Sequence, residues 1–241
     1  MHLSNGFQLD QNARLSVIIP VFHDTRPLLD LIDDLKPLGR LVHEIIVVDG
    51  AQDASLDSLL SANHVQLFRT NPERAGQMNF GAQQASGDIL WFLHADTRLT
   101  KETVSDLVNF IQCPKTCWGR FNVHLEPSGF LLKIVAWFMN HRSALTAIST
   151  GDQGMFVNRV AFNRVGGFPS QLLMEDIELS KRLKRLSRPF IPKSHIITSS
   201  RKWQREGIFK TIFTMWYLRF IYWRGASAEQ VHRIYYRRKS Q

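Results

Sequence analysis

The sequence has little cysteine and no long apolar run, and both shortages narrow the class of protein. Of its 241 residues only two are cysteines, Cys113 and Cys117. Two thiols cannot build a disulfide scaffold, and they lack the second pair of ligands of a structural zinc site. No stretch reaches about 18 consecutive apolar residues, so a spanning helix is not expected. Residues 1–16 contain no apolar signal-peptide core. We therefore expect reduced thiols and a cytoplasmic location.

Acidic residues are scarce at the C-terminal end. Residues 181–241 contain 16 Lys and Arg against 2 Asp and Glu, whereas residues 1–180 contain 14 against 19. A basic segment of this kind predicts an anionic partner. Charge alone leaves nucleic acid, anionic lipid headgroups and phosphorylated small molecules open. The whole chain is 44% hydrophobic and 21% charged, which is typical of a globular protein with a sizeable core.

Apolar runs alternate with helical patterns in the first 110 residues or so. A near-continuous apolar run such as LSVIIPVF is typical of a strand buried on both faces of a parallel sheet. The alternation indicates βαβ units and predicts an α/β fold. Strands are predicted at 15–22, 44–48, 65–68, 89–93, 118–125 and 154–157. Helices are predicted at 28–35, 54–62, 75–85, 100–111 with Thr100 as N-cap, 130–139, 175–186, 208–223 and 227–238.

Acidic residues follow three of the predicted parallel strands. Asp24 follows the first strand, Asp49 and Asp53 the second, and Asp96 the fourth. Each alone is explained as a cap of a turn or helix. Together they form an acidic edge that a cation or a donor-rich ligand must neutralise, and such ligands bind at the carboxyl ends of the strands. Asp96 suits Mg²⁺ or Mn²⁺, which complete their shell with phosphate oxygens and water.

Several motifs of other enzyme classes are missing. The chain has no Gly-x-x-x-x-Gly-Lys-Ser loop and no Gly-x-Gly-x-x-Gly after the first strand. It has no His-x-x-Glu-His zinc spacing and no nucleophilic Ser or Cys motif. These absences disfavour P-loop, dinucleotide-binding and zinc hydrolase functions.

Six short segments between residues 15 and 186 occur in a characteristic order. They are VIIPVF (17–22), VVDGAQD (47–53), RAGQMNFGA (74–82), LHAD (93–96), VGGF (165–168) and MEDIELSKRL (174–183). This set resembles family 2 glycosyltransferases of the GT-A fold. The block from Arg74 to Thr97, with SRKW at 200–203, is similar to a bacterial subgroup of small transferases in that family.

The resemblance implies a fold, an activity and a domain layout. The fold is a mixed, mainly parallel sheet flanked by helices, with a helical C-terminal extension. A glycosyltransferase domain would span 1–200, with a nucleotide-sugar half at about 15–112 and an acceptor half at about 113–200, followed by a basic, aromatic extension at 201–241. The activity would be inverting, metal-assisted transfer of a sugar from a nucleotide-diphosphate sugar, of UDP or GDP type, to a hydroxyl acceptor.

The resemblance also implies the donor site. Asp49 would accept the N–H of the base, Asp24 would support that pocket, and Asp53 would order its loop. Asp96 matches the metal-binding acid of the family's Asp-x-Asp motif, with a divalent cation, Mn²⁺ or Mg²⁺, as cofactor, whereas His94 replaces the first acid. The donor-site set is Pro20, Val21, Asp24, Asp49, Asp53, Arg74, Gln77, Asn79, His94, Ala95 and Asp152.

The catalytic residues implied are Asp176, as the base for the acceptor hydroxyl, and its neighbour Glu175. A base of this kind works best with a raised pKa. The alternative is that both acids only complement the dipole of a helix N-terminus. For Asp152, which would contact sugar or acceptor, the alternative is an ordinary turn residue. Arg201, Lys202 and Trp203 would clamp the departing diphosphate or the acceptor; alternatively they form a basic loop anchored by the tryptophan.

The predicted helix at 208–223 is rich in aromatic residues and carries Lys210, Arg219 and Arg224. Such a helix fits the surface of an anionic membrane, here the inner face of the cytoplasmic membrane, with a lipid-linked acceptor. It equally fits packing on the sheet or in a homodimer, with the arginine stems reaching to solvent. Lys133 in the helix at 130–139 allows the same two interpretations.

Two other function classes stay open on the sequence. A sugar-phosphate nucleotidyltransferase would need a glycine-rich loop after the first strand, and VFHDTRPL contains no glycine. A non-catalytic nucleotide- or nucleic-acid-binding protein would explain the basic segment, but its cations are scattered and no binding motif is present, so no nucleic acid partner is expected. The sugar, the base, the acceptor and the oligomeric state are not determined.

Overall fold

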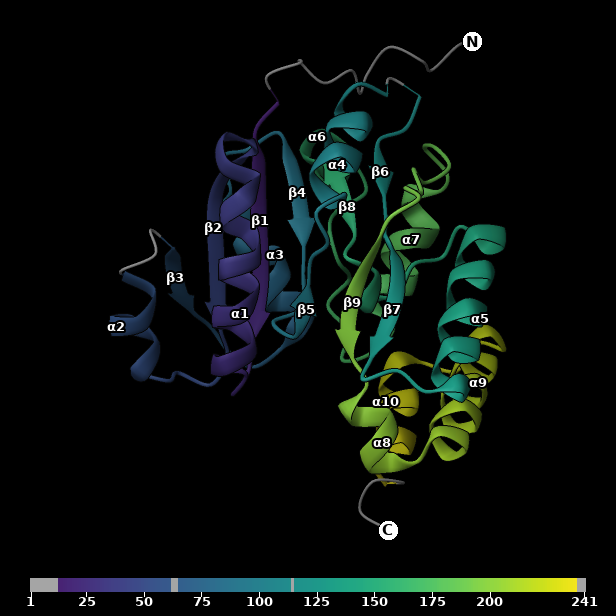
Figure 1. Ribbon diagram of the computed structural model, residues 1–241. Coiled ribbons are helices and arrows are strands. Elements are labelled where there is room, and N and C mark those ends of the chain that lie inside the picture. The colour runs from purple at the N-terminus through teal and green to yellow at the C-terminus, as the bar shows by residue number, and fades with distance from the viewer. Residues whose placement is uncertain (1–12, 62–64, 114, 238–241) are drawn as a thin grey trace.

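The computed structural model describes residues 13–61, 65–113 and 115–237. Its main sheet has six strands in the order β3-β2-β1-β4-β8-β6 (Figure 1). The first four strands along the chain are parallel, as predicted, whereas β8 runs antiparallel to β4 and β6. The bounds are Leu15–Val21 (β1), Val42–Asp49 (β2), Gln66–Arg69 (β3), Ile89–Phe92 (β4), Trp118–Gly119 (β6) and Phe156–Asn158 (β8). The mixed, mainly parallel α/β sheet is thereby confirmed.

A second sheet of three strands stands beside the first. It has the order β5-β9-β7, with bounds Thr97–Arg98 (β5), His195–Ser199 (β9) and Asn122–Glu126 (β7). The prediction of one strand at 118–125 was wrong, because residues 118–119 pair in the main sheet and residues 122–126 in the second. The chain changes sheets at Arg120 and Phe121, which are both fully buried.

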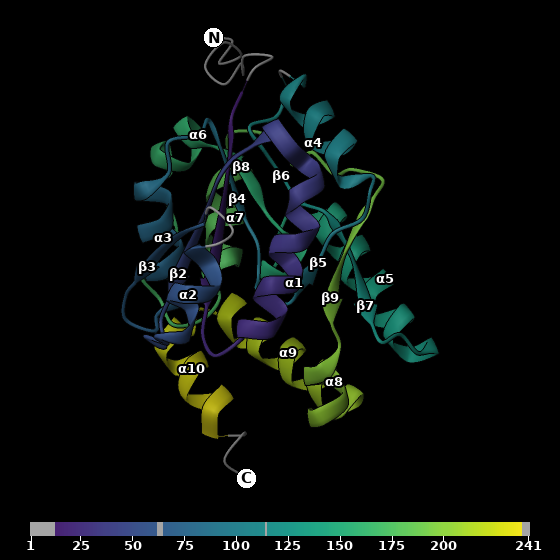
Figure 2. The same cartoon turned by 60° about the vertical axis from the view of Figure 1, so that its left-hand side comes forward.

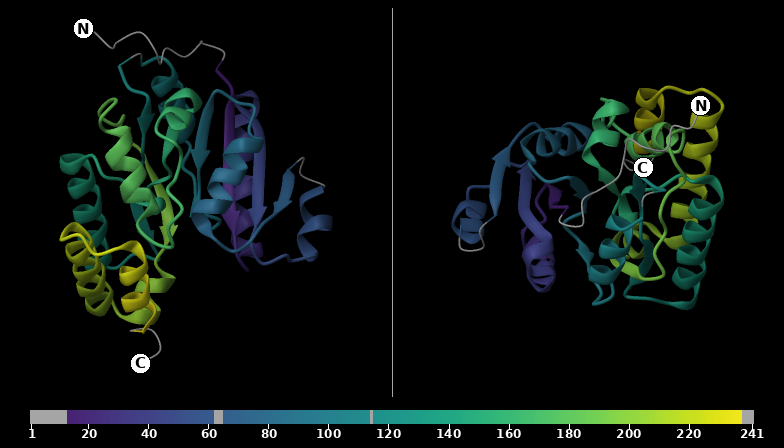
Figure 3. Two further views of the ribbon diagram at one scale, coloured as in Figure 1. Left: turned by 180° about the vertical axis from the view of Figure 1, so that it is seen from behind. Right: turned by 90° about the horizontal axis from the view of Figure 1, so that it is seen from above.

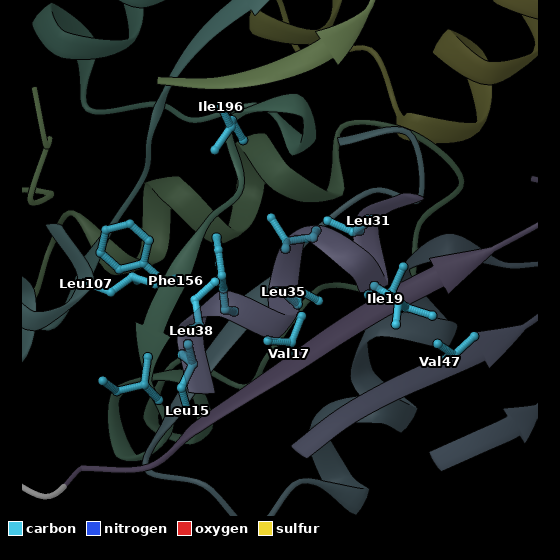
Figure 4. Close-up of a cluster of buried hydrophobic side chains, with 14 of the residues drawn as sticks. Leu15, Val17, Ile19, Leu31, Leu35, Leu38, Val47, Leu107, Phe156 and Ile196 are labelled. Carbon is cyan, nitrogen blue, oxygen red and sulfur yellow. The ribbon is translucent and has the colours of Figure 1, made fainter. Parts of the chain in front are cut away.

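Each face of the main sheet carries its own core. On one face Val17 and Ile19 pack with α1 (Thr25–Leu35) and α4 (Thr103–Ile111), as Figure 4 shows for part of this cluster. On the other face Ile18 packs with α3 (Arg74–Gln84), α6 (Arg159–Arg164) and α7 (Glu175–Leu183). The view from above in Figure 3 shows these layers. Because β1 is buried on both sides, its sequence is apolar except for the buried Ser16.

The remaining helices lie mainly at the second sheet and at the carboxyl ends of the parallel strands (Figures 1 and 2). They are η1 (Lys36–Leu41), α2 (Ser55–Ser61), α5 (Phe130–Thr146), η2 (Gly151–Gln153), α8 (Arg201–Glu206), α9 (Ile208–Trp223) and α10 (Ala228–Arg237). Among the described residues, no helix combines the length and the apolarity needed to cross a membrane.

Two helix predictions need correction. The helix predicted from Thr100 begins at Thr103, because Thr100 closes a turn in which its carbonyl accepts the N–H of Thr103. The helix predicted at 130–139 runs on to Thr146. Asn140, where the apolar pattern breaks, does not end the helix, because its side-chain amide bonds the N–H and C=O of Val123 in β7.

Candidate active site

The loop after β2 is organised by Asp49, which is completely buried. Its Oδ1 accepts the N–H of Ala51 at 2.8 Å and its Oδ2 accepts the N–H of Asp53 at 2.7 Å. Gln77 joins this loop to the neighbouring strand, since its amide donates to the carbonyls of Val21 and Val48. Both side chains therefore shape the carboxyl ends of β1 and β2, and a direct contact of Asp49 with a base stays a prediction.

The backbone is strained at the same strand ends. His23, after β1, has φ 58°, and Gln52, after β2, has φ 56°. Residues with a Cβ seldom adopt this left-handed conformation, and it concentrates at functional sites. Asp53 stabilises the second loop by accepting the N–H of Ser55, and this bond lowers the pKa of its carboxyl. Sequence reasoning missed this strain because neither position is a glycine.

Asn79 lies on α3 and holds the VGGF turn. Its amide donates to the carbonyl of Phe168 at 2.8 Å and its Oδ1 accepts the N–H of Phe168 at 2.9 Å. Gly167 has φ 66°, and a Cβ there would lie 2.7 Å from the Asn79 oxygen. The structure thus uses Asn79 to fix the chain that leads to α7, and its predicted place at the donor remains untested.

A polar chain joins α3, the end of β4, η2 and α7. Nη2 of Arg74 lies 2.9 Å from Nδ1 of His94, which lies 3.3 Å from Oδ1 of Asp152. Nε of Arg74 lies 3.7 Å from Oε1 of Glu175. The residue after His94 is the buried Ala95. Four predicted site residues from distant parts of the sequence are thereby brought together.

Gly151 permits this close assembly. A Cβ at this position would lie 2.5 Å from Nε2 of His94 and 2.7 Å from Nη2 of Arg74. We expect Gly151→Ala to push both side chains aside, to destabilise the protein by about 1–3 kcal/mol and to lower transferase activity. The matched control is Gly129→Ala, since nothing lies within 4 Å of a Cβ there. Urea unfolding and initial rates of both variants check this; equal behaviour of the two variants would contradict it.

Asp96 is half-buried and lies among other acids. Burial and repulsion by Asp152 and Asp24 raise the pKa of Asp96, and His94 and Arg201 partly offset the shift. Such a carboxylate fits a hard divalent cation, because the cation would remove the repulsion and leave coordination positions for phosphate oxygens. The described residues contain no group of three or more His, Cys, Asp or Glu arranged to hold a metal.

The predicted clamp residues Arg201, Lys202 and Trp203 form the start of the helix α8. The alternative interpretation had placed them in a loop. Nη2 of Arg201 lies 3.9 Å from Oδ1 of Asp24, and its Nε donates to Ser199. Arg201 therefore stands close to the charged groups around Asp96. Trp203 is partly buried against the core between α5 and β7, and the side chain of Lys202 lies outside the described residues.

Glu175 and Asp176 occupy the start of α7. Met174, just before them, has φ 67°. Oδ2 of Asp176 accepts the N–H of Gly151 at 2.7 Å and Oδ1 accepts the N–H of Ile177 at 2.8 Å. Burial and the neighbouring Asp176 raise the pKa of Glu175 to about 7, although Arg74 acts in the opposite direction. The pair thus combines a firmly oriented carboxylate with a buried acid that titrates near neutrality.

The raised pKa of Glu175 predicts a pH-dependent stability. Its ordinary pKa is 4.5, so the folded protein binds this proton more tightly than the unfolded chain does. The cost of ionising Glu175 is absent below pH 4.5, grows as the pH rises towards 7 and is complete above it. It amounts to about 3 kcal/mol. Hence Glu175→Gln should gain roughly 5–10 °C in unfolding temperature relative to the wild type between pH 5 and pH 8. Calorimetry at both pH values measures this, and a constant difference would refute it.

Sequence reasoning missed two arginines near Asp176. Arg142 of α5 and Arg219 of α9 both interact electrostatically with Asp176. The sequence left Arg219 either at a membrane surface or with its stem reaching to solvent; in the structure it is partly buried, and burial lowers its pKa. A lone arginine in an apolar helix gives no signal that separates these two situations.

The sequence of residues 16–165 matches the family described as glycosyl transferase family 2. This chain belongs to that family. The family is described by its glycosyl transferase activity. A comparison with curated proteins gave no match.

Solved structures of glycosyltransferases share the fold of this family 2 member. The mannosyltransferase PcManGT from Pyrobaculum calidifontis, in complex with GDP-Man and Mn²⁺, is 19% identical with a TM-score of 0.65, over 93% of this chain and 70% of its own. TarS 1-349 of S. aureus is 19% identical with a TM-score of 0.63, over 78% of this chain and 60% of its own. Glucosyl-3-phosphoglycerate synthase from Mycobacterium tuberculosis is 18% identical with a TM-score of 0.54, over 78% and 70%. The GT-A fold expected from the sequence is thereby confirmed.

Proposed function

We propose that the protein is an inverting glycosyltransferase that moves a sugar from a nucleotide-diphosphate sugar to a hydroxyl acceptor. The main support for this proposal comes from the contacts of the short helix η2. Gly151 in it donates its N–H to Asp176, and the next residue, Asp152, lies 3.3 Å from Nδ1 of His94, which stands two residues before Asp96. Helix η2 therefore links the candidate base to the strand end that carries the candidate metal-binding acid. A donor bound at Asp96 would present its sugar to Asp176.

The residues then have distinct tasks. Asp176, oriented by the N–H groups of Gly151 and Ile177, accepts the proton of the acceptor hydroxyl. The hydroxyl oxygen forms its bond to the anomeric carbon while the bond to the diphosphate oxygen breaks on the opposite face, so the configuration inverts. Arg74 and Arg201 offset the negative charge that develops on the diphosphate. Asp96 would hold a divalent cation, which neutralises the same charge when bound.

Neighbours of this fold support the donor class. PcManGT was solved with GDP-Man and TarS 1-349 with UDP-GlcNAc. Asp49, Asp53 and Gln77 build the strand ends at which a base of either type would bind. We propose a UDP or GDP sugar as donor and Mn²⁺ or Mg²⁺ as cofactor.

A donor hydrolysis assay tests this proposal without knowledge of the acceptor. The protein is incubated with UDP and GDP sugars and Mn²⁺, and release of the nucleoside diphosphate is measured, with water in place of the acceptor. We expect slow release with one nucleotide class and none after chelation of the metal. Release of a sugar phosphate instead would favour a nucleotidyltransferase, and no turnover together with tight RNA or DNA binding would favour a nucleic-acid-binding protein.

We also propose that α5 and α9 face an anionic membrane surface. Among the described residues, twelve of the eighteen exposed large hydrophobic side chains lie on these two helices. They are Phe130, Leu131, Ile134, Trp137, Phe138, Leu145, Phe209, Phe213, Trp216, Tyr217, Phe220 and Trp223. Exposed Lys133, Lys210 and Arg224 accompany them. Aromatic and basic side chains together fit the headgroup region of an anionic leaflet, with residues 201–241 as the docking extension of the catalytic domain.

Flotation with vesicles checks the membrane proposal. Vesicles with phosphatidylglycerol should retain the wild type and release Trp216→Ala/Trp223→Ala at least about tenfold more readily, because burial of large aromatic side chains is lost. Trp203→Ala is the control, because Trp203 is a partly buried tryptophan outside the exposed set on α5 and α9. Equal binding of all three proteins would contradict membrane docking, and a loss of dimer mass in the double variant without vesicles would assign the face to a homodimer instead.

A further inference from the structure

Two partly buried cations interact with the candidate base. Arg142 comes from α5 and Arg219 from α9, and each attracts Asp176 electrostatically. Arg219 also interacts with Asp152, and the two guanidinium groups repel each other. Burial is the main cause that lowers the pKa of Arg142 to about 10, and it lowers the pKa of Arg219 as well. Positive charge is thus concentrated beside the carboxylate that would activate the acceptor.

The described part of the chain offers no hydrogen-bond partner to either guanidinium. No hydrogen bond or ion pair of either group is found there, and Nη2 of Arg142 is buried without a partner. The oxygens of Asp176 accept the N–H groups of Gly151 and Ile177 instead. Arg120 differs, because it is fully buried and donates to the carbonyls of Phe121 and Asn140 and to the side chain of Asn122.

The helices hold the two arginines in place. Leu132 and Val135 of α5 pack in one cluster with Ile208 and Ile212 of α9, and Figure 1 shows the two helices side by side. Leu218, the neighbour of Arg219, packs in another cluster with Leu173 and Met174, which directly precede Glu175. The arginines therefore belong to a rigid framework around the start of α7 rather than to a mobile surface.

This arrangement is costly unless an anion completes it. Removing a guanidinium from water without a partner carries a large desolvation penalty, and the repulsion between Arg142 and Arg219 adds to it. Planar guanidinium groups bind phosphate oxygens in a bidentate manner, and two of them match the charge of a phosphate monoester. Asp176 attracts both arginines, but its oxygens already accept backbone N–H groups.

We propose that Arg142 and Arg219 bind a phosphate monoester carried by the acceptor, and so position the acceptor hydroxyl at Asp176. This rests on the proposed function, since it requires Asp176 to be the base. The phosphate can belong to a soluble molecule or to a lipid. The arginines act as binding and positioning residues, whereas the proton transfer stays with Asp176.

Inorganic phosphate is the probe for the first experiment. Unfolding temperatures are measured at constant ionic strength for the wild type, Arg142→Gln, Arg219→Gln and the control Arg185→Gln, which removes an exposed charge from the segment after α7. With phosphate at ten times its Kd we expect a rise of about 3–5 °C in the wild type and the control, and none in the other two. Without phosphate, Arg142→Gln should unfold at or above the wild-type temperature, whereas loss of a structural arginine would lower it. If a glutamine variant fails to fold, Arg142→Lys takes its place. Lysine keeps the charge but not the planar, bidentate guanidinium, so this variant should lose most of the phosphate response.

Measurements with further ligands identify the source of the phosphate. They also distinguish a failure of this anion site from a failure of the proposed glycosyltransferase function. An arginine-dependent response to glycerol 3-phosphate assigns a soluble acceptor; an arginine-dependent preference for phosphatidic acid over phosphatidylglycerol vesicles assigns a lipid. Nucleoside diphosphates should stabilise all the variants equally. A phosphate response that is absent, or equal in all variants, overturns the subsite, and loss of the nucleotide response with the arginines overturns its assignment to the acceptor. An arginine-dependent phosphate response without any nucleotide binding would confirm the anion site. It would contradict the proposed glycosyltransferase function and, with it, the role of this site in binding the acceptor.

Discussion

Asp176→Asn should lower the rate of sugar transfer by a factor of about 10²–10⁴, the usual contribution of a positioned general base. Asparagine cannot take the proton of the acceptor hydroxyl. It has one acceptor oxygen, so either the N–H of Gly151 or that of Ile177 loses its present partner. The unfolding temperature should therefore fall by only a few degrees, because one unmade hydrogen bond costs about 1–3 kcal/mol. Steady-state kinetics and a thermal melt of the same preparation measure both effects.

The matched control is Glu178→Gln on the same helix. Glu178 pairs with Lys181 and Arg182 on a partly exposed side of α7, and such pairs contribute little. Its loss should leave the rate within about twofold of the wild type. Retention of full activity in Asp176→Asn, or an equal loss in the two variants, would remove the base from Asp176.

The second large effect is expected for Asp96→Asn, which should abolish the response of donor binding to Mn²⁺. Transfer should fall by at least about 10²-fold, because charge on the leaving diphosphate is no longer neutralised. In the absence of metal this variant should be at least as stable as the wild type at pH 8, since it no longer suffers repulsion from Asp152 and Asp24. Isothermal titration with the nucleoside diphosphate, with and without Mn²⁺, measures the metal response of donor binding. A thermal melt at pH 8 measures the stability.

Asp57→Asn serves as control for that experiment. Asp57 lies on α2 and pairs with Arg69, outside the acidic group around Asp96. It should keep the metal response in full. An Asp96→Asn protein that still binds the nucleotide more tightly with Mn²⁺ would show that the cation is held elsewhere or is not needed.

The parallel part of the fold could be predicted because burial on both faces leaves a direct mark on the sequence. The run that forms β4 is entirely apolar and that of β1 is interrupted only by Ser16, and α3 and the VGGF turn occur in family order. The switch between sheets at Arg120 could not be predicted, because an alternating segment such as WGRFNVHL has the same pattern whether it pairs in one sheet or in two. The pairing depends on distant partners, β8 and β9.

The sequence predicted a set of site residues but not their contacts. Arg74, His94 and Glu175 were predicted from the family motifs and Asp152 from the strand that follows it, and the structure brings these four side chains together. The structural tasks of Gln77 and Asn79 depend on carbonyls remote in the sequence. The burial of Arg142 and Arg219 depends on how α5 and α9 pack, and no local pattern encodes that.

The most direct test of the account is the unfolding temperature of the wild type against a panel of nucleoside diphosphates, with and without Mn²⁺. Binding to the folded state raises this temperature by mass action, so no acceptor is needed. The account predicts a metal-dependent rise with UDP or GDP, which would also name the donor base. A cooperative melt that none of the nucleotides shifts, with or without the metal, would contradict the assignment of this cleft to a nucleotide-sugar donor.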